Sequence, residues 1–133
     1  MQFFRNYPFL PAVLFFIITV VLLTLPGSSF PKSHLFDIPF FDKWVHIGMF
    51  STLCFLFTFP IVHFSISDSK KRQWFWIILF SGIIYGVLME FVQKYWAINR
   101  SFDILDMVAD SIGSLLALII SYQILNRKIK LKS

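Results

Sequence analysis

Two carboxylates of this 133-residue chain lie within strongly apolar sequence, Glu90 in the run 74–96 and Asp110 in the run 107–125. An ionised carboxylate near the centre of a membrane helix costs about 2.5–3.5 kcal/mol. Such groups therefore face the interior of a bundle, where they pair with other polar groups or handle protons, ions or polar ligands. These two acids are the first candidates for chemistry.

Other polar residues lie at spacings that bring them close to the two acids. Asp42 and His46 are four residues apart, as are Asp106 and Asp110, so each pair shares one face of a helix. Crowding of this kind favours a shared hydrogen-bonded network over isolated buried charges. The predicted pocket consists of Asp42, Lys43, His46, Glu90, Gln93, Arg100, Asp103, Asp106 and Asp110.

A divalent metal is one possible occupant of this pocket. Carboxylate oxygens with one histidine suit Mg²⁺, Ca²⁺ or Mn²⁺. The spacing matches no recognised metal motif, so the sequence leaves the cofactor open. The candidate ligands would be His46, Glu90, Asp106 and Asp110.

A structural role explains the same residues without any ligand. Asp42 would favour the start of a helix through the helix dipole, and Lys43 would extend to the membrane interface. Arg100 would either neutralise neighbouring acids or bind a phosphate-bearing head group. His34 and His63 are isolated. The sequence contains no evident pair of nucleophile and base, so no catalytic residue is assigned.

Four apolar stretches must position these side chains, at 7–25, 44–64, 74–96 and 107–125. About 20 apolar residues cross the hydrocarbon layer as a helix. With 57% hydrophobic and 14% charged residues, the chain is too apolar for a soluble domain of this size. The sequence therefore predicts an all-α fold, an integral membrane four-helix bundle that forms a single domain over 1–133. Gly82 and Gly86 would allow a close helix approach.

The basic residues predict an orientation in the membrane. Eight lysines and arginines lie before the first stretch, between the second and third, and after the fourth; four lie in the other two gaps or at their edges, as Lys94 does at the end of the third stretch. The positive-inside rule then places both termini in the cytoplasm and the predicted pocket at the outer surface. Because the basic residues flank apolar runs, topology explains the net charge of +5, and no nucleic-acid partner is expected.

Four motifs in order resemble the VanZ-like family of small bacterial membrane proteins. They are FDKWVH at 41–46, GVLMEFVQ at 86–93, NRSFDILD at 99–106 and DSIG at 110–113. The family pattern has a D-K-x-x-H opening, a G-x-x-x-E-x-x-Q helix and an R-x-x-D-x-x-D return that ends in [ND]-x-x-G. Asp110 stands where many relatives carry Asn. The resemblance covers about 42–118, over half of the chain.

The resemblance implies a multi-pass protein of the bacterial inner membrane with a role at the cell envelope. The family is named for a protein associated with low-level resistance to the glycopeptide teicoplanin, and it implies no particular reaction. We expect contact with membrane lipids and a pocket that binds a lipid-linked cell-wall precursor or an envelope protein. One alternative is a hydrolase or transferase acting on a lipid phosphate or glycan, with Glu90 or an aspartate as base and His46 as acid. A transporter is another, and it would need an oligomer.

Overall fold

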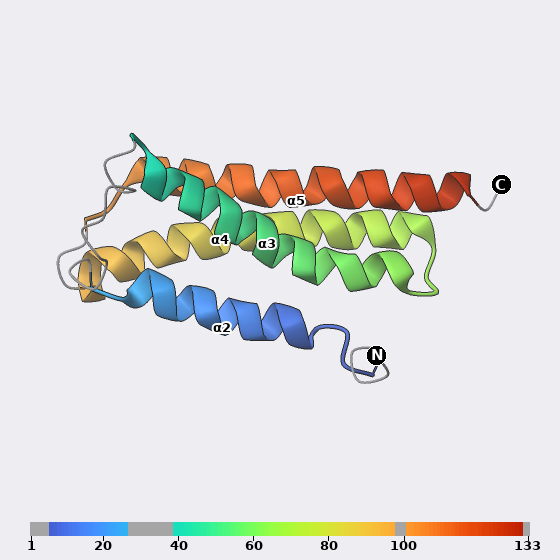
Figure 1. The fold of residues 1–133 in the computed structure, drawn as a ribbon, viewed down its shortest axis with the longest axis horizontal. Coiled ribbons are helices and arrows are strands. Elements are labelled where there is room, and N and C mark those ends of the chain that lie inside the picture. Colours follow the sequence, from blue (N-terminus) through green and yellow to red (C-terminus); the bar gives the residue numbers. More distant parts are fainter. Residues whose placement is uncertain (1–5, 27–38, 98–100, 132–133) are drawn as a thin grey trace.

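The computed structural model describes residues 6–26, 39–97 and 101–131, and their regular structure is helical (Figure 1). The helices are α2 (Leu10–Thr24), α3 (Phe41–His63), α4 (Asp68–Trp96) and α5 (Ile104–Lys130). The all-α bundle predicted from the sequence is confirmed. Helices α3, α4 and α5 are long and apolar enough to cross a membrane, whereas α2 is a shorter apolar helix of 15 residues.

Proline limits the length of α2. The apolar run 7–25 predicts a helix of 19 residues, but α2 begins only at Leu10, with Pro11 in its first turn. Proline is tolerated there because the first N–H groups of a helix have no partner within it. The helix ends before Pro26, as expected for residues that precede a proline. At 1.5 Å per residue α2 is about 22 Å long, less than the hydrocarbon thickness of about 30 Å.

Helices α4 and α5 extend beyond the predicted apolar runs. Helix α4 begins at Asp68, where the Ser67 hydroxyl accepts a hydrogen bond from the Lys70 backbone N–H at 3.4 Å. Helix α5 begins after Asp103, whose Oδ1 accepts from the Leu105 N–H at 2.8 Å. It ends at Lys130 in a basic last turn, which the helix dipole favours. These polar end turns are stabilised by capping residues and by charges near the helix ends. Hydropathy alone therefore does not predict them.

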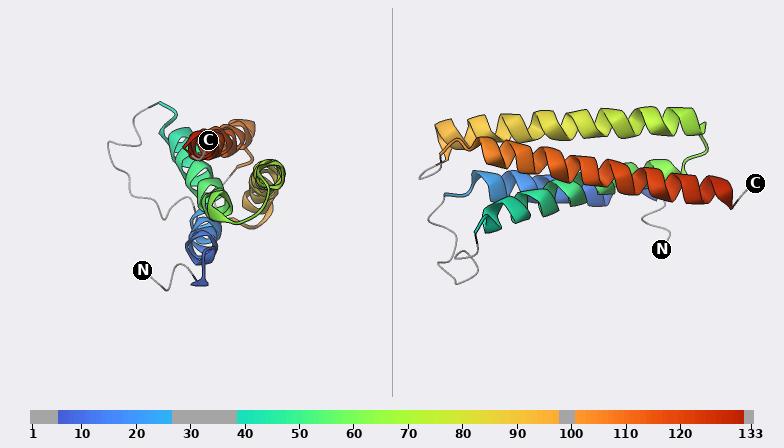
Figure 2. Two further views of the ribbon diagram at one scale, coloured as in Figure 1. Left: turned by 90° about the vertical axis from the view of Figure 1, so that its right-hand side faces the viewer. Right: turned by 90° about the horizontal axis from the view of Figure 1, so that it is seen from above.

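The helices alternate in direction, and α3 packs most extensively against α5 (Figures 1 and 2). Helix α4 packs on α5, and α2 lies at the periphery against α3 and α4. Glycine makes the closest approach possible: a Cβ at Gly113 would lie 2.5 Å from the Ile47 carbonyl oxygen. At Gly82 it would lie 2.7 Å from both Cys54 Sγ and Ser114 Oγ. The predicted close approach at Gly82 is therefore present.

Small polar side chains line the interior between α3 and α5. The hydroxyls of Thr58 and Ser121 are 2.6 Å apart, and the Cys54 thiol donates to Ser114 Oγ at 3.5 Å. The outer faces are apolar instead: Ile84 of α4, for example, is 58% exposed, and Ile112 and Leu115 of α5 are exposed as well. A bundle with polar groups inside and apolar side chains outside is suited to lipid as its solvent. The chain is a membrane protein.

Candidate functional site

One end of the bundle gathers the ionisable side chains that the sequence selected. Because the helices alternate in direction, the start of α3, the end of α4 and the start of α5 lie together, at the left of Figure 1. We call the described members the polar cluster: Asp42, Lys43, His46, Glu90, Gln93, Asp103, Asp106 and Asp110. The ninth predicted residue, Arg100, lies outside the described residues, as does His34.

His46 on α3 pairs with an aspartate on α5. Its Nδ1 lies 2.8 Å from Asp110 Oδ1 in a hydrogen bond, and its Nε2 lies 3.9 Å from Asp106 Oδ2. The side chains of His46 and Asp110 are 7% and 2% exposed, so the pair is nearly removed from solvent. The sequence placed His46 beside Asp42 on one helix face, whereas its hydrogen-bond partner comes from another helix.

Lys43 joins three aspartates at the edge of the cluster. Its Nζ donates to Asp42 Oδ2 at 2.7 Å and to Asp103 Oδ2 at 2.5 Å, and it lies 2.7 Å from Asp106 Oδ1. The hydrogen bond from Lys43 holds the pKa of Asp103, which precedes α5, below its ordinary value. The ammonium group therefore compensates charge that would otherwise be concentrated at this end.

The same three aspartates are the described group that comes close enough to hold one metal ion. Oxygens of Asp42, Asp103 and Asp106 lie within 4.8 Å of one another. Since Lys43 Nζ is already in contact with all three, its ammonium takes the place of a cation there. The metal ligands considered from the sequence were a different set, in which His46 and Glu90 accompanied Asp106 and Asp110.

Glu90 is the most deeply buried acid of the polar cluster, with 0% exposure. Its Oε2 accepts a hydrogen bond from the Asp103 backbone N–H at 2.9 Å, but its Oε1 has no hydrogen-bond partner among the described residues. Gln93 Nε2, one turn further along α4, is also buried, and none of the residues that the structure describes bonds it. A buried polar group without a partner costs about 1–3 kcal/mol, so such groups point to a further molecule.

Asp106 Oδ1 is a different case. It makes no well-directed hydrogen bond, yet it lies 2.7 Å from Lys43 Nζ. The ion pair compensates this oxygen, because the attraction between opposite charges depends on distance more than on direction. Within the described part of the chain, Glu90 Oε1 and Gln93 Nε2 are therefore the groups of the polar cluster that have neither a hydrogen bond nor an ion pair.

The described members of the polar cluster include more carboxyl groups than bases. Its five carboxylates are accompanied by Lys43 and His46 as the described bases. A hydrogen-bond donor or a positive group in a ligand would be favoured here, and a bare anion would be repelled. The arrangement can therefore recognise hydroxyl, amide or ammonium groups.

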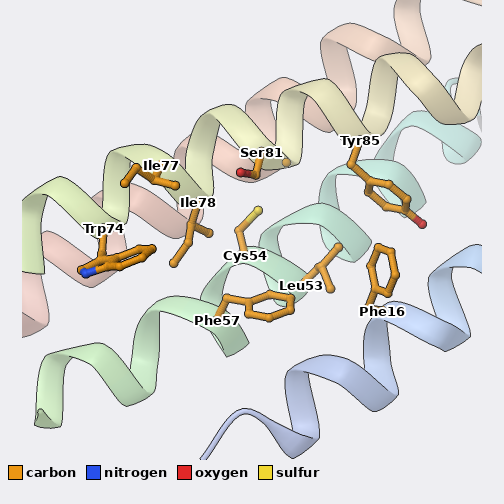
Figure 3. A pocket seen from close by; sticks show the side chains of 10 residues that line it. Phe16, Leu53, Cys54, Phe57, Trp74, Ile77, Ile78, Ser81 and Tyr85 are labelled. Carbon is orange, nitrogen blue, oxygen red and sulfur yellow. The ribbon is translucent and has the colours of Figure 1, made fainter.

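The structure also shows a cavity that the sequence did not indicate. It lies between α2, α3 and α4, away from the polar cluster, and has a volume of about 380 Å³ (Figure 3). Its walls are apolar, so its residues resemble any others in a membrane span and give no signal in the sequence.

His63, which is isolated in the sequence, lies at the end of α3. Its ring Nδ1 is 3.1 Å from the Phe59 carbonyl oxygen of the same helix, in keeping with an incidental role.

Comparison with known proteins adds no relative to this picture. No family model matches the chain, and no curated protein or solved structure matches it. The VanZ-like resemblance rests on the four motifs alone.

Proposed function

We propose that this chain is a non-catalytic, VanZ-like membrane module of the bacterial cell envelope. Its polar cluster binds the polar part of a lipid-linked cell-wall precursor or a similar envelope ligand. The observation that carries the proposal is the fully buried Glu90, whose Oε1 has no hydrogen-bond partner among the described residues, as is also true of Gln93 Nε2 one turn further along α4. Intramembrane ionisable groups drawn from three helices mark a functional site by default.

The two unpartnered atoms favour a particular ligand chemistry. Glu90 Oε1 accepts hydrogen bonds, and Gln93 Nε2 donates them. A sugar hydroxyl or a peptide amide offers both functions in one group, whereas a phosphate offers acceptors only. The surplus of carboxyl groups over bases among the described members of the polar cluster also disfavours a phosphate. The proposed contact is therefore made with the glycan or peptide part of the ligand.

Charge at the two ends of the bundle supports an outward-facing polar cluster. The opposite end carries Lys70, Lys71, Arg72, Arg127, Lys128 and Lys130 with one acid, Asp68. By the positive-inside rule this basic end lies in the cytoplasm, which also places both termini there. The polar cluster then faces the outside of the inner membrane, where cell-wall precursors are used. A changed susceptibility to teicoplanin is the cellular effect that the VanZ-like resemblance adds.

The arrangement gives less support to a hydrolase or transferase. A general acid must reach the leaving group with a free proton donor. Both ring nitrogens of His46 face carboxylates instead, Asp110 at 2.8 Å and Asp106 at 3.9 Å. Binding without reaction is therefore the better account of the polar cluster.

The proposal is tested by binding measured on the full chain in lipid nanodiscs. A polyprenyl-linked peptidoglycan precursor is titrated, and native mass spectrometry measures the fraction of protein that has bound it. We expect Glu90→Gln to weaken binding about tenfold or more, because it removes a charged hydrogen-bond acceptor. The control is Asp68→Asn at the basic end, which should bind as the wild type does. No binding by the wild type, or equal binding by Glu90→Gln, would refute the proposal.

A further inference from the structure

The cavity between α2, α3 and α4 is built from apolar side chains. Phe16 of α2 faces Leu53 and Phe57 of α3, and α4 contributes Trp74 and Tyr85 at opposite ends (Figure 3). None of the residues that line it is charged. Its volume of about 380 Å³ lies within the range of about 300–1,000 Å³ that is usual for small-molecule sites.

The cavity is elongated and open to the lipid side of the bundle. It follows α4 from Trp74 to Tyr85, three turns or about 16 Å at 1.5 Å per residue. Trp74 and Ile77 are 49% and 44% exposed, so this wall is accessible from outside. An apolar slot that runs parallel to a membrane helix has the shape and chemistry of an extended hydrocarbon chain.

A basic group lies where such a chain would reach the membrane surface. Lys70 is four residues before Trp74, so it lies on the same face of α4, one turn closer to the helix start. Lys71 is buried and pairs with Asp68 at 3.2 Å, whereas Lys70 is exposed and makes no ion pair with a described residue. Trp74 marks the interface, where indole rings prefer to lie.

We propose that this cavity binds one acyl chain of an anionic membrane phospholipid, whose head group contacts Lys70. A lysine at the membrane surface attracts anionic head groups, which gives the site its selection among lipids. The apolar walls supply the affinity for the chain. This lipid site is separate from the polar cluster, since the cavity begins at the basic end of α4 and the polar cluster lies at the other end.

The occupant would also connect α2 to the rest of the bundle. Helix α2 contacts α3 and α4 less than those helices contact α5. A hydrogen bond between the hydroxyls of Thr19 and Tyr85, 3.0 Å apart, links α2 to α4 at the Tyr85 end of the cavity. An acyl chain lying against Phe16 and Phe57 would fill the space between α2 and α3 on the Trp74 side of this hydrogen bond.

The test uses the full chain in nanodiscs that contain a phospholipid with a photoreactive diazirine in one acyl chain. The probe is supplied either as phosphatidylglycerol or as phosphatidylcholine. After illumination, we expect crosslinks at the cavity residues of α3 and α4, with phosphatidylglycerol giving about fivefold more than phosphatidylcholine. Crosslinks confined to the outer face around Ile84 would refute the site, and equal labelling by both lipids would refute the anionic head group.

Variants distinguish binding of the acyl chain from recognition of the head group. Lys70→Gln should bring the two lipids to equal labelling, while Arg127→Gln, at the same end but on α5, should keep the preference. Ser81→Phe, which fills the cavity from α4, should abolish the cavity crosslinks of both lipids. Thermal unfolding shows whether Ser81→Phe folds; if it does not, the comparison of Lys70→Gln with Arg127→Gln decides. A preference unchanged in Lys70→Gln, or lost equally in Arg127→Gln, would refute the role of Lys70.

Discussion

Asp110 of α5 lies against Gly86 of α4, and its carboxylate forms a hydrogen bond with His46 of α3. A Cβ at Gly86 would lie 2.6 Å from Asp110 Oδ2, and Asp110 Oδ1 is 2.8 Å from His46 Nδ1. One buried aspartate therefore contacts the other two long helices at once. The small residue at Gly86 is what leaves room for it, so the fold and the polar cluster depend on the same contact.

Asp110→Asn should be tolerated far better than Asp110→Leu. The amide oxygen of asparagine can still accept a hydrogen bond from His46, whereas leucine leaves the ring nitrogen buried without a partner. We expect Asp110→Leu to lower the free energy of unfolding by about 1–3 kcal/mol, and Asp110→Asn to change it by less. Unfolding by sodium dodecyl sulfate in mixed micelles measures both. Equal losses would show that His46 does not depend on this hydrogen bond.

Glu90→Gln and Glu90→Leu should separate folding from function. Glutamine retains an oxygen that can accept from the Asp103 backbone N–H, now 2.9 Å from Glu90 Oε2, but it lacks the charge. We expect a normal unfolding transition with impaired ligand binding. Leucine removes the acceptor too, so both stability and binding should fall, the former by about 1–3 kcal/mol. A Glu90→Leu protein as stable as the wild type would mean that the hydrogen bond to Asp103 contributes little.

Alanine at Gly113 should destabilise the bundle, and alanine at Gly48 should not. The new methyl at Gly113 would lie 2.5 Å from the backbone oxygen of Ile47 and 3.0 Å from the backbone nitrogen of Ser51, so α3 and α5 must separate. Overpacking of this kind costs about 1–3 kcal/mol. At Gly48 nothing lies within 4 Å, and the better helix propensity of alanine should be neutral or favourable. Equal melting temperatures of the two variants would argue against this packing.

Acid should weaken the contact between Lys43 and Asp103. Because the hydrogen bond from Lys43 lowers the pKa of Asp103 in the folded protein, the contact contributes fully above the unfolded pKa of about 4. It is lost as the pH falls further, through the folded pKa. Asp103→Asn keeps an oxygen that can cap α5 but lacks this charge. Below about pH 4 its melting temperature should therefore fall less steeply than that of the wild type; parallel curves would contradict the assignment.

The proposed orientation can be measured with two single cysteines. Ser101→Cys precedes α5 at the polar cluster, and Ser69→Cys lies in the first turn of α4 at the basic end. Both positions are exposed, while the native Cys54 is buried in the bundle. On intact cells an impermeant maleimide should label Ser101→Cys and spare Ser69→Cys. The reverse pattern would place the polar cluster in the cytoplasm and remove its proposed envelope ligand.

The sequence predicts the three long helices well because a membrane imposes both length and composition on them. It overestimates α2, since hydropathy counts residues 7–9 that precede the helix start near Pro11. It also misses the polar first turn of α4, which depends on the Ser67 cap and lies outside the apolar run. Hydropathy identifies what is buried in lipid, whereas capping decides where a helix begins and ends.

The members of the polar cluster were predictable, but their pairing was not. An acid within a membrane span must face inward, which selects Glu90 and Asp110 without a structure. Spacing along one helix relates His46 to Asp42, yet the hydrogen bond forms with Asp110 on α5. Lys43 likewise reaches Asp103 and Asp106, some 60 residues away. Which side chains on different helices become partners depends on the rotation and crossing angles of the helices, and these angles cannot be read from a single sequence.

The extensive packing of α3 against α5 has a consequence for the order of events during synthesis. A ribosome completes α3 and α4 before α5 exists, so His46 and Lys43 enter the membrane ahead of Asp106 and Asp110. Helices insert first and associate afterwards. Until α5 is inserted, the nascent protein holds these two bases at the membrane without the two aspartates that contact them in the complete bundle. A nascent protein stalled before residue 104 would therefore remain an assembly intermediate. Groups that α5 contacts in the complete protein, such as His46, would still be accessible to insertion factors or to water.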